Sequence, residues 1–152
     1  MSKIELGDIF EIDTRKGKAY FQCVRIDKIK LDLIKVFNKI YQKRPESIES
    51  VITVKDNYFI GFALSTAYRR KLVEKVGNVT LPIDFDLPKY MRSKHVIRGQ
   101  FLGWHIIDTN TLKRELVEKL SIDQQHLSPW GIWNDTLLKE SLESGWSLEN
   151  WK

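Results

Sequence analysis

The residues of this chain that could do metal or acid–base chemistry are three histidines and two closely spaced aspartates. His95, His105 and His126 lack the HxH or HExxH spacing with which zinc hydrolases usually present their ligands. Asp84 and Asp86 would share one face of an extended segment, where paired carboxylates can bind a divalent ion or share a proton. No further acid stands near them, so we interpret this stretch as a solvated loop and expect no metal and no cofactor.

A general base with an orienting carboxylate is the other chemistry that the sequence suggests. His105 and Asp108 could form such a pair, but a spacing of three residues puts strand side chains on opposite faces. We therefore interpret His105, beside Trp104, as a structural histidine. The patterns GxGxxG, GxxxxGK[ST] and GxSxG are absent. The sequence predicts no catalytic residues and hence a protein that is not an enzyme.

Strands must position most of these side chains. Alternating or β-branched stretches predict strands at 7–13, 18–26, 31–37, 58–64, 79–81 and 99–108, and helical spacing predicts short helices at 46–52, 67–71 and 121–127. A longer helix should begin at Asn134 or Asp135, end at Ser144, and bury Leu137 and Leu138. We interpret residues 82–98 as a long loop, and favour a strand over a helix for residues 111–120. The expected fold is α+β: a curved, mostly antiparallel, partly barrel-like sheet with a few short helices.

Composition bounds the class of protein. The 152 residues are 42% hydrophobic and 30% charged, which suits one globular domain spanning residues 1–152. No apolar run is long enough for a membrane span, and the start shows no signal peptide, so we expect a cytoplasmic protein. The single Cys23 should be a buried small hydrophobe.

The charge is unevenly distributed along the chain. Residues 14–44 contain ten Lys and Arg against two Asp, a net of +8, whereas residues 120–152 contain five acids against two bases, a net of −3. A basic stretch of this kind can bind nucleic acid, although it is also typical of solvated strand faces. Four tryptophans lie after residue 129; we expect most to pack in the core, with Trp130 and Trp151 as candidates for binding a partner.

Five segments resemble one bacterial family. They are GDIFEI (7–12), AYFQCVRI (19–26), LIKVF (33–37), VGNVTLP (76–82) and LLKESLESGW (137–146), and together they are similar to the immunity protein 26 family. The resemblance implies a small cytosolic protein that binds a cognate toxin, encoded nearby, and so protects the producing cell. The family's name is also linked with a small phosphotriesterase. This sequence offers no recognisable cluster of metal ligands for that activity.

One feature departs from what the resemblance implies. Immunity proteins against nucleases tend to be acidic, because they compete with nucleic acid for a basic cleft, whereas this chain carries a net charge of +5. Either the toxin surface is acidic, or the acidic C-terminal stretch makes the contact. The candidate acids are Asp123, Asp135, Glu140, Glu143 and Glu149. The alternatives are a nucleic-acid-binding domain that uses residues 14–44, and a metal-dependent phosphoesterase that uses some of the histidines with Asp84 and Asp86.

Overall fold

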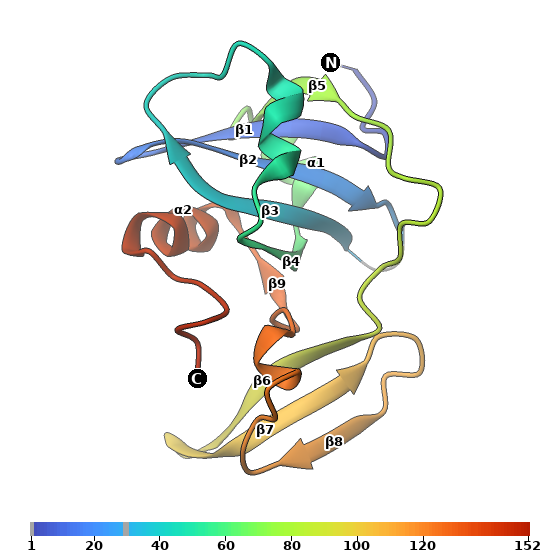
Figure 1. Ribbon diagram of the computed structural model, residues 1–152, viewed down its shortest axis with the longest axis vertical. Coiled ribbons are helices and arrows are strands. Elements are labelled where there is room, and N and C mark those ends of the chain that lie inside the picture. The colour runs from blue at the N-terminus through green and yellow to red at the C-terminus, as the bar shows by residue number, and fades with distance from the viewer. Residues whose placement is uncertain (1, 29–30) are drawn as a thin grey trace.

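The strands of this chain form two sheets (Figure 1). The structure is a computed structural model that describes residues 2–28 and 31–152. The larger sheet has the order β5-β1-β2-β3-β4-β9, with β1 at Asp8–Thr14, β2 at Gly17–Arg25, β3 at Asp32–Tyr41, β4 at Asn57–Phe62, β5 at Glu74–Asn78 and β9 at Ile132–Trp133. The smaller sheet has the order β6-β7-β8, with β6 at Tyr90–Ile97, β7 at Gln100–Asp108 and β8 at Arg114–Val117.

Helices are short in the described part of the chain. They are α1 at Leu64–Arg69, α2 at Asp135–Ser144, and the 3-10 helices η1 at Ile48–Thr53 and η2 at Gln124–His126. The α+β class is confirmed, and the pairings are antiparallel apart from the parallel pair of β4 with β9. The six-stranded sheet is not closed into a barrel. None of the described helices is long and apolar enough to cross a bilayer.

The N-terminal hairpin forms as its alternating residues predict. Ile9 pairs with Gln22, and Thr14 pairs with Gly17 at the turn. Gly17 has a φ of +141°, and a Cβ there would lie 2.5 Å from the carbonyl oxygen of Tyr41. Only glycine therefore lets β3 pass this close to the turn.

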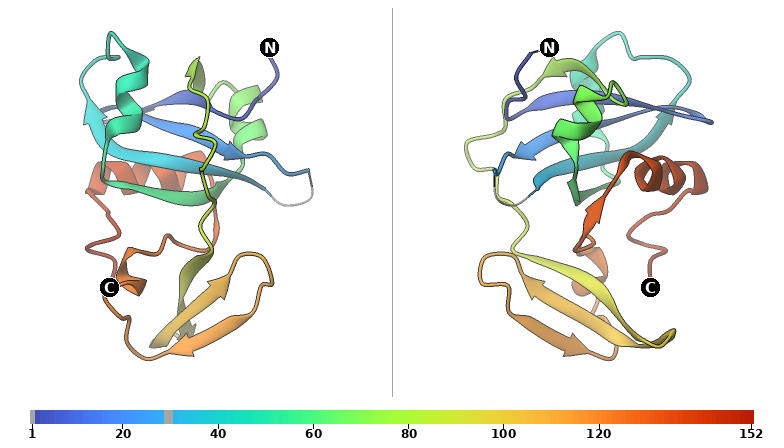
Figure 2. Two further views of the ribbon diagram at one scale, coloured as in Figure 1. Left: turned by 45° about the vertical axis from the view of Figure 1, so that its right-hand side comes forward. Right: turned by 180° about the vertical axis from the view of Figure 1, so that it is seen from behind.

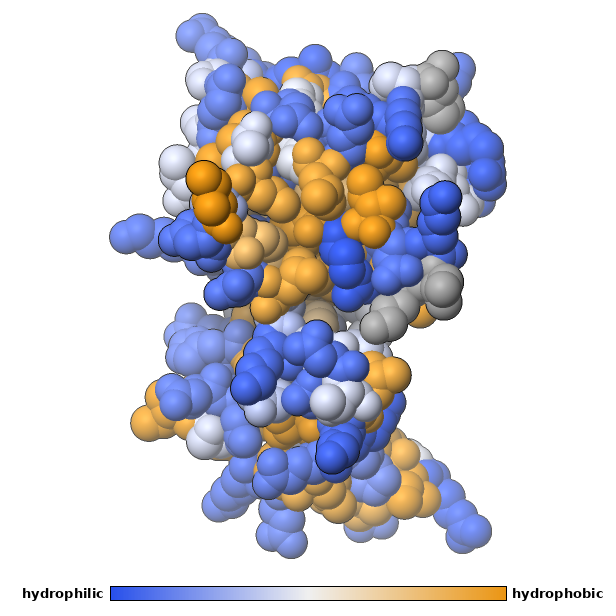
Figure 3. All heavy atoms as spheres, turned by 90° about the vertical axis from the view of Figure 1, so that its right-hand side faces the viewer, coloured by the Kyte–Doolittle hydropathy of each residue, from blue (hydrophilic) through white to orange (hydrophobic). Residues whose placement is uncertain are grey.

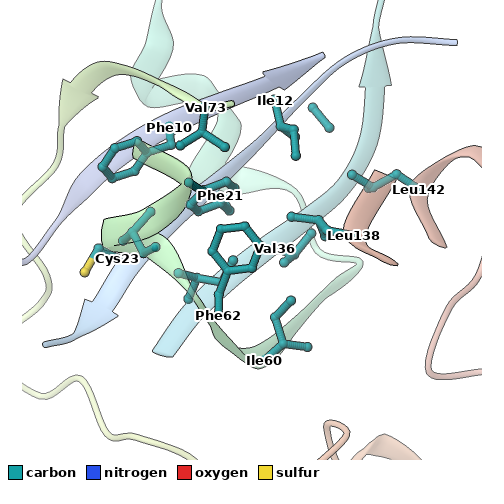
Figure 4. Close-up of a cluster of buried hydrophobic side chains, with 14 of the residues drawn as sticks. Phe10, Ile12, Phe21, Cys23, Val36, Ile60, Phe62, Val73, Leu138 and Leu142 are labelled. Carbon is teal, nitrogen blue, oxygen red and sulfur yellow. The ribbon is translucent and has the colours of Figure 1, made fainter. Parts of the chain in front are cut away.

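Both faces of the six-stranded sheet are covered. On one face Phe10, Phe21 and Ile60 pack with Leu138 and Leu142 of α2 (Figure 4). On the other face Ile48 and Val51 of η1 pack with Ile9, Tyr20 and Phe37 of the sheet. Farther along, the linker formed by residues 79–89 runs across this second face toward the smaller sheet (Figure 2). Leu81 and Phe85 of this linker pack against the cluster formed by Val24, Leu33 and Met91.

Cys23 is buried in the first of these clusters, as predicted. Burial, with the nearby charges of Asp32 and Asp8, raises the pKa of its thiol to about 12. The thiol therefore stays protonated at neutral pH and acts as a packing group.

The prediction of a loop over residues 82–98 was wrong, because its second half forms β6. The turn between β6 and β7 consists of Arg98 and Gly99, with φ values of 52° and 79°. Positive φ at both positions defines the turn that matches the twist of a hairpin. Arginine is unusual at the first of these positions, so the turn was not recognised in the sequence.

Several other boundaries also differ from the predictions. The third strand continues to Tyr41 because Asn38, in its polar second half, donates backbone and side-chain hydrogen bonds to Asp56. The strand expected at 79–81 lies earlier, at β5, because Gly77 pairs with Ile9. The strand favoured over residues 111–120 is confirmed for its middle part, which forms β8, whereas Leu112 lies in the turn before it. Helix α2 begins and ends where expected, although Leu137 is exposed.

Candidate binding groove

A groove of about 1010 Å³ lies between the two sheets. Its walls are mostly apolar and come from both sheets and the linker: Leu31, Leu33, Phe85, Leu87, Pro88, Met91, Leu112, Trp130 and Ile132. Figure 3 views the molecule from the side of the linker and shows it narrowing between the sheets, with hydrophobic side chains gathered above the narrow part. A concave, largely apolar surface of this size is typical of a binding site.

The segment that carries Trp130 is held by hydrogen bonds to both sheets. The backbone N–H of Trp130 donates to the carbonyl of Arg92 in β6 (2.7 Å), and the backbone N–H of Arg92 donates to the carbonyl of Ser128 (2.9 Å). The Ser128 hydroxyl accepts from the N–H of Phe59 in β4 (2.9 Å). Trp130 is therefore fixed at the junction of the two sheets, where it is half-buried.

Close packing of backbones forms the floor of the groove near β4. The N–H of Gly61 donates to the carbonyl of Gly131 at 3.2 Å. A Cβ on Gly61 would lie 2.8 Å from that carbonyl oxygen. The glycine therefore allows the segment that carries Trp130 to lie directly against the edge of β4.

Polar groups line one end of the groove. Arg25 and Lys89 stand there together with Asp27 and Asp86. Arg25 donates from Nη2 to the carbonyl of Leu31 (2.9 Å), whereas its buried Nε has no hydrogen-bond partner among the described residues. A buried donor without a partner lowers stability.

The two predicted partner-binding tryptophans have different surroundings. Trp130 packs with Met91, whereas Trp151 stacks on the guanidinium of Arg92, 4.4 Å from its ring centroid. Met91 and Arg92 are successive residues of a strand, so their side chains point to opposite faces. The structure therefore brings Trp130 into the groove and places Trp151 on the other face of β6.

None of the acids predicted to bind a partner is among the described residues that line the groove. Asp135, Glu140 and Glu143 lie on α2, Asp123 precedes η2, and Glu149 lies in the C-terminal segment. Glu143 forms an ion pair with Arg15 (3.2 Å) and accepts from the backbone N–H of that residue, so it stabilises the packing of α2 on the hairpin. The structure gathers three of these acids on one helix and leaves the other two apart.

Three basic residues of the 14–44 stretch form ion pairs within the described part of the fold. Arg15 pairs with Glu143, Lys18 with Glu11 and Asp13, and Arg44 with Glu11 and Glu74. Lys35 lies half-buried over the ring of Phe59, and its burial lowers its pKa. Part of the positive charge of this stretch is therefore neutralised by acids of the same chain.

The structure brings together only two of the residues considered for metal chemistry. His95 and His105 are in contact on the smaller sheet, with His105 Nε2 2.9 Å from His95 Nδ1. His126 lies in η2, and Asp84 and Asp86 lie in the linker. Residues 2–28 and 31–152 contain no group of three or more histidine, cysteine or acidic side chains that could hold a metal ion. The Asp108 carboxylate, which was considered as a partner of His105, accepts hydrogen bonds from the backbone N–H groups of Asn110 and Thr111 in the turn before β8.

Most of the groove has little signal in the sequence. Phe85 and Met91 fell within the expected loop, and Leu112 lies in the turn between β7 and β8. Recognition of the Arg98–Gly99 turn would have predicted β6 and placed Met91 on a strand.

In comparisons with protein-family models, curated proteins and solved structures, no significant match to this chain was found.

Proposed function

We propose that this protein neutralises a cognate protein toxin by binding it, without catalysis, and that the groove receives part of the toxin. The observation that carries the proposal is the groove itself, whose apolar walls come from both sheets and include the half-buried Trp130. Tryptophan in a partly buried pocket is a frequent centre of binding energy in protein interfaces. The resemblance to immunity protein 26 supplies the class of partner.

The chemistry of the groove suits a protein segment. Apolar walls provide desolvation energy, and Arg25 and Lys89 at one end of the groove supply positive charge for a backbone carbonyl or a carboxylate of the partner. Protein interfaces combine an apolar centre with a polar rim in this way. The mostly apolar walls of the groove favour this proposal over the nucleic-acid alternative, because phosphate binding needs a surface lined by cations.

The first test places a charge on the groove wall. Leu112→Asp should weaken the complex with the toxin of the neighbouring gene by about tenfold or more, because a carboxylate would have to be desolvated on binding. Leu112 is 50% exposed, so the variant should fold normally. Leu137→Asp on α2, where the leucine is 41% exposed, is the matched control. Calorimetry with both variants measures the difference, and equal affinities would contradict a role for the groove.

The second test addresses catalysis. A protein that acts only by binding neutralises one toxin molecule with each of its own molecules. Toxin activity should therefore return once the toxin is in molar excess. A catalyst would inactivate the excess toxin with time. Titration of the toxin's own activity at fixed amounts of this protein separates the two cases. Turnover of the toxin, seen as a change in its mass, would overturn the proposal.

A further inference from the structure

Two imidazole rings meet on one face of the three-stranded sheet. His105 stands directly opposite Ser93, and His95 stands opposite Gly103, so the histidines occupy diagonal positions of adjacent strands. Their ring centroids are 4.5 Å apart and the rings are tilted by 73°. The two nearest nitrogens, His105 Nε2 and His95 Nδ1, are 2.9 Å apart.

That separation matches the spacing of two adjacent ligands on a metal ion. Two nitrogens at a metal distance of about 2.0 Å and 2.9 Å from each other subtend an angle of about 90° at the metal. A tetrahedral angle would need a separation of about 3.3 Å. Right angles are typical of square-planar and tetragonal Cu²⁺ and Ni²⁺, for which imidazole is a preferred ligand.

We propose that His95 and His105 form a binding site for a divalent transition-metal ion of tetragonal preference, Cu²⁺ or Ni²⁺. The ion takes His105 Nε2 and His95 Nδ1 as adjacent ligands, and its remaining positions are filled by water or by a ligand from another molecule. The proton that lies between the facing nitrogens in the metal-free pair moves through solvent to the other nitrogen of its ring. Each ring then presents an unprotonated nitrogen to the ion, as ligation requires.

The site is open and rigidly built. Both histidines are half-buried, and their neighbours Ile97, Leu102 and Leu116 are exposed. The strands that carry the pair are joined by a continuous register from Tyr90 to His95. The proposal is independent of the groove, because neither histidine is among its lining residues.

The charges around the pair act in two directions. Burial, together with His95 and Arg114, lowers the pKa of His105, which reduces the competition of protons with a metal ion for this ring. The positive charge of Arg114 also opposes a bound cation. Removing this charge should therefore strengthen metal binding, whereas removing either histidine should weaken it.

Calorimetric titration of tag-free protein with CuCl₂ and with NiCl₂ tests the site. One ion per chain should bind, with Cu²⁺ tighter than Ni²⁺. His95→Ala and His105→Ala should each weaken binding about tenfold or more. The matched control is His126→Ala, which removes the histidine of η2 and should leave binding unchanged. Arg114→Gln should tighten it, a change that partial unfolding would not produce.

A spectroscopic measurement keeps the proposal falsifiable. The electron paramagnetic resonance spectrum of the Cu²⁺ complex should show two imidazole nitrogens in wild type and one in either alanine variant. Circular dichroism without metal checks that these variants are folded. Absence of binding in wild type, or equal binding by wild type and His105→Ala, would overturn the proposal.

Discussion

Glu11 is the buried acid on which the most contacts converge. It is 4% exposed, accepts a hydrogen bond from the Tyr20 hydroxyl (2.7 Å), and forms ion pairs with Arg44 (3.0 Å) and Lys18 (3.4 Å). Burial alone would raise its pKa, but hydrogen bonds from Arg44 and Tyr20 and the charges of Arg44 and Lys18 outweigh burial and lower the pKa to about 2. The carboxylate thus links β1 to the segment after β3.

Acid should therefore destabilise the protein through Glu11. Because its pKa is lower in the folded than in the unfolded chain, its contribution is complete above pH 4.5 and is lost as the pH falls toward 2. Glu11→Gln should reduce the free energy of unfolding by about 2 kcal/mol at pH 7 and by much less at pH 3. Urea unfolding at both pH values measures this. Glu140→Gln, an exposed acid on α2, is the control and should show neither effect.

Strand β6 is fixed to the C-terminal segment by the side chain of Arg92. This guanidinium is fully buried and donates to four carbonyl groups, those of Leu127 (3.0 Å), Trp151 (2.7 Å), Gln125 (3.1 Å) and Leu148 (3.1 Å). Its guanidinium carbon lies 4.7 Å from the ring centroid of Trp104 and 4.4 Å from that of Trp151. Burial lowers its pKa to about 10, so the group is still charged at neutral pH.

Arg92→Lys should therefore not be a conservative change. A lysine ammonium has three donors on a flexible stem and cannot reproduce a planar fork that reaches four carbonyls. We expect a loss of about 3 kcal/mol in the free energy of unfolding, since several buried carbonyls lose their donor. Faster digestion by carboxypeptidase should accompany it. Arg98→Lys in the exposed turn is the control; equal stability of the two variants would contradict this role of Arg92.

Elements with local signals could be predicted from the sequence, and those with distant partners could not. Helix α2 carries its own start and end: the Asn134 side chain accepts from the N–H of Leu137 (2.9 Å), and Gly145 adopts a left-handed conformation. Arg92 gave no comparable signal, because its acceptors lie 33 to 59 residues away. The groove has the same character, since its walls come from strands, linker and turns that meet only in the fold.

A chain of aromatic rings connects the two sheets through the C-terminal segment. Tyr58 of the six-stranded sheet contacts Trp146 (4.9 Å between centroids), Trp146 contacts Trp151 (5.6 Å), and Trp151 contacts Trp104 of the smaller sheet (5.0 Å). Figure 1 shows this last segment ending between the sheets. The groove lies between the same two sheets, so this contact helps to fix the distance between its walls.

Trp151→Ala should therefore uncouple the sheets. The variant removes the ring that contacts both Trp146 and Trp104, so amides of β6–β8 should exchange hydrogen about tenfold faster while those of β1–β4 change little. Trp133→Ala is the contrast: Trp133 contacts Tyr58 and Trp146, so its loss should speed exchange in the six-stranded sheet first. An equal rise in both sheets for Trp151→Ala would mean that they open as one cooperative unit. Weaker toxin binding by Trp151→Ala than by wild type should follow, because the groove needs both walls in place.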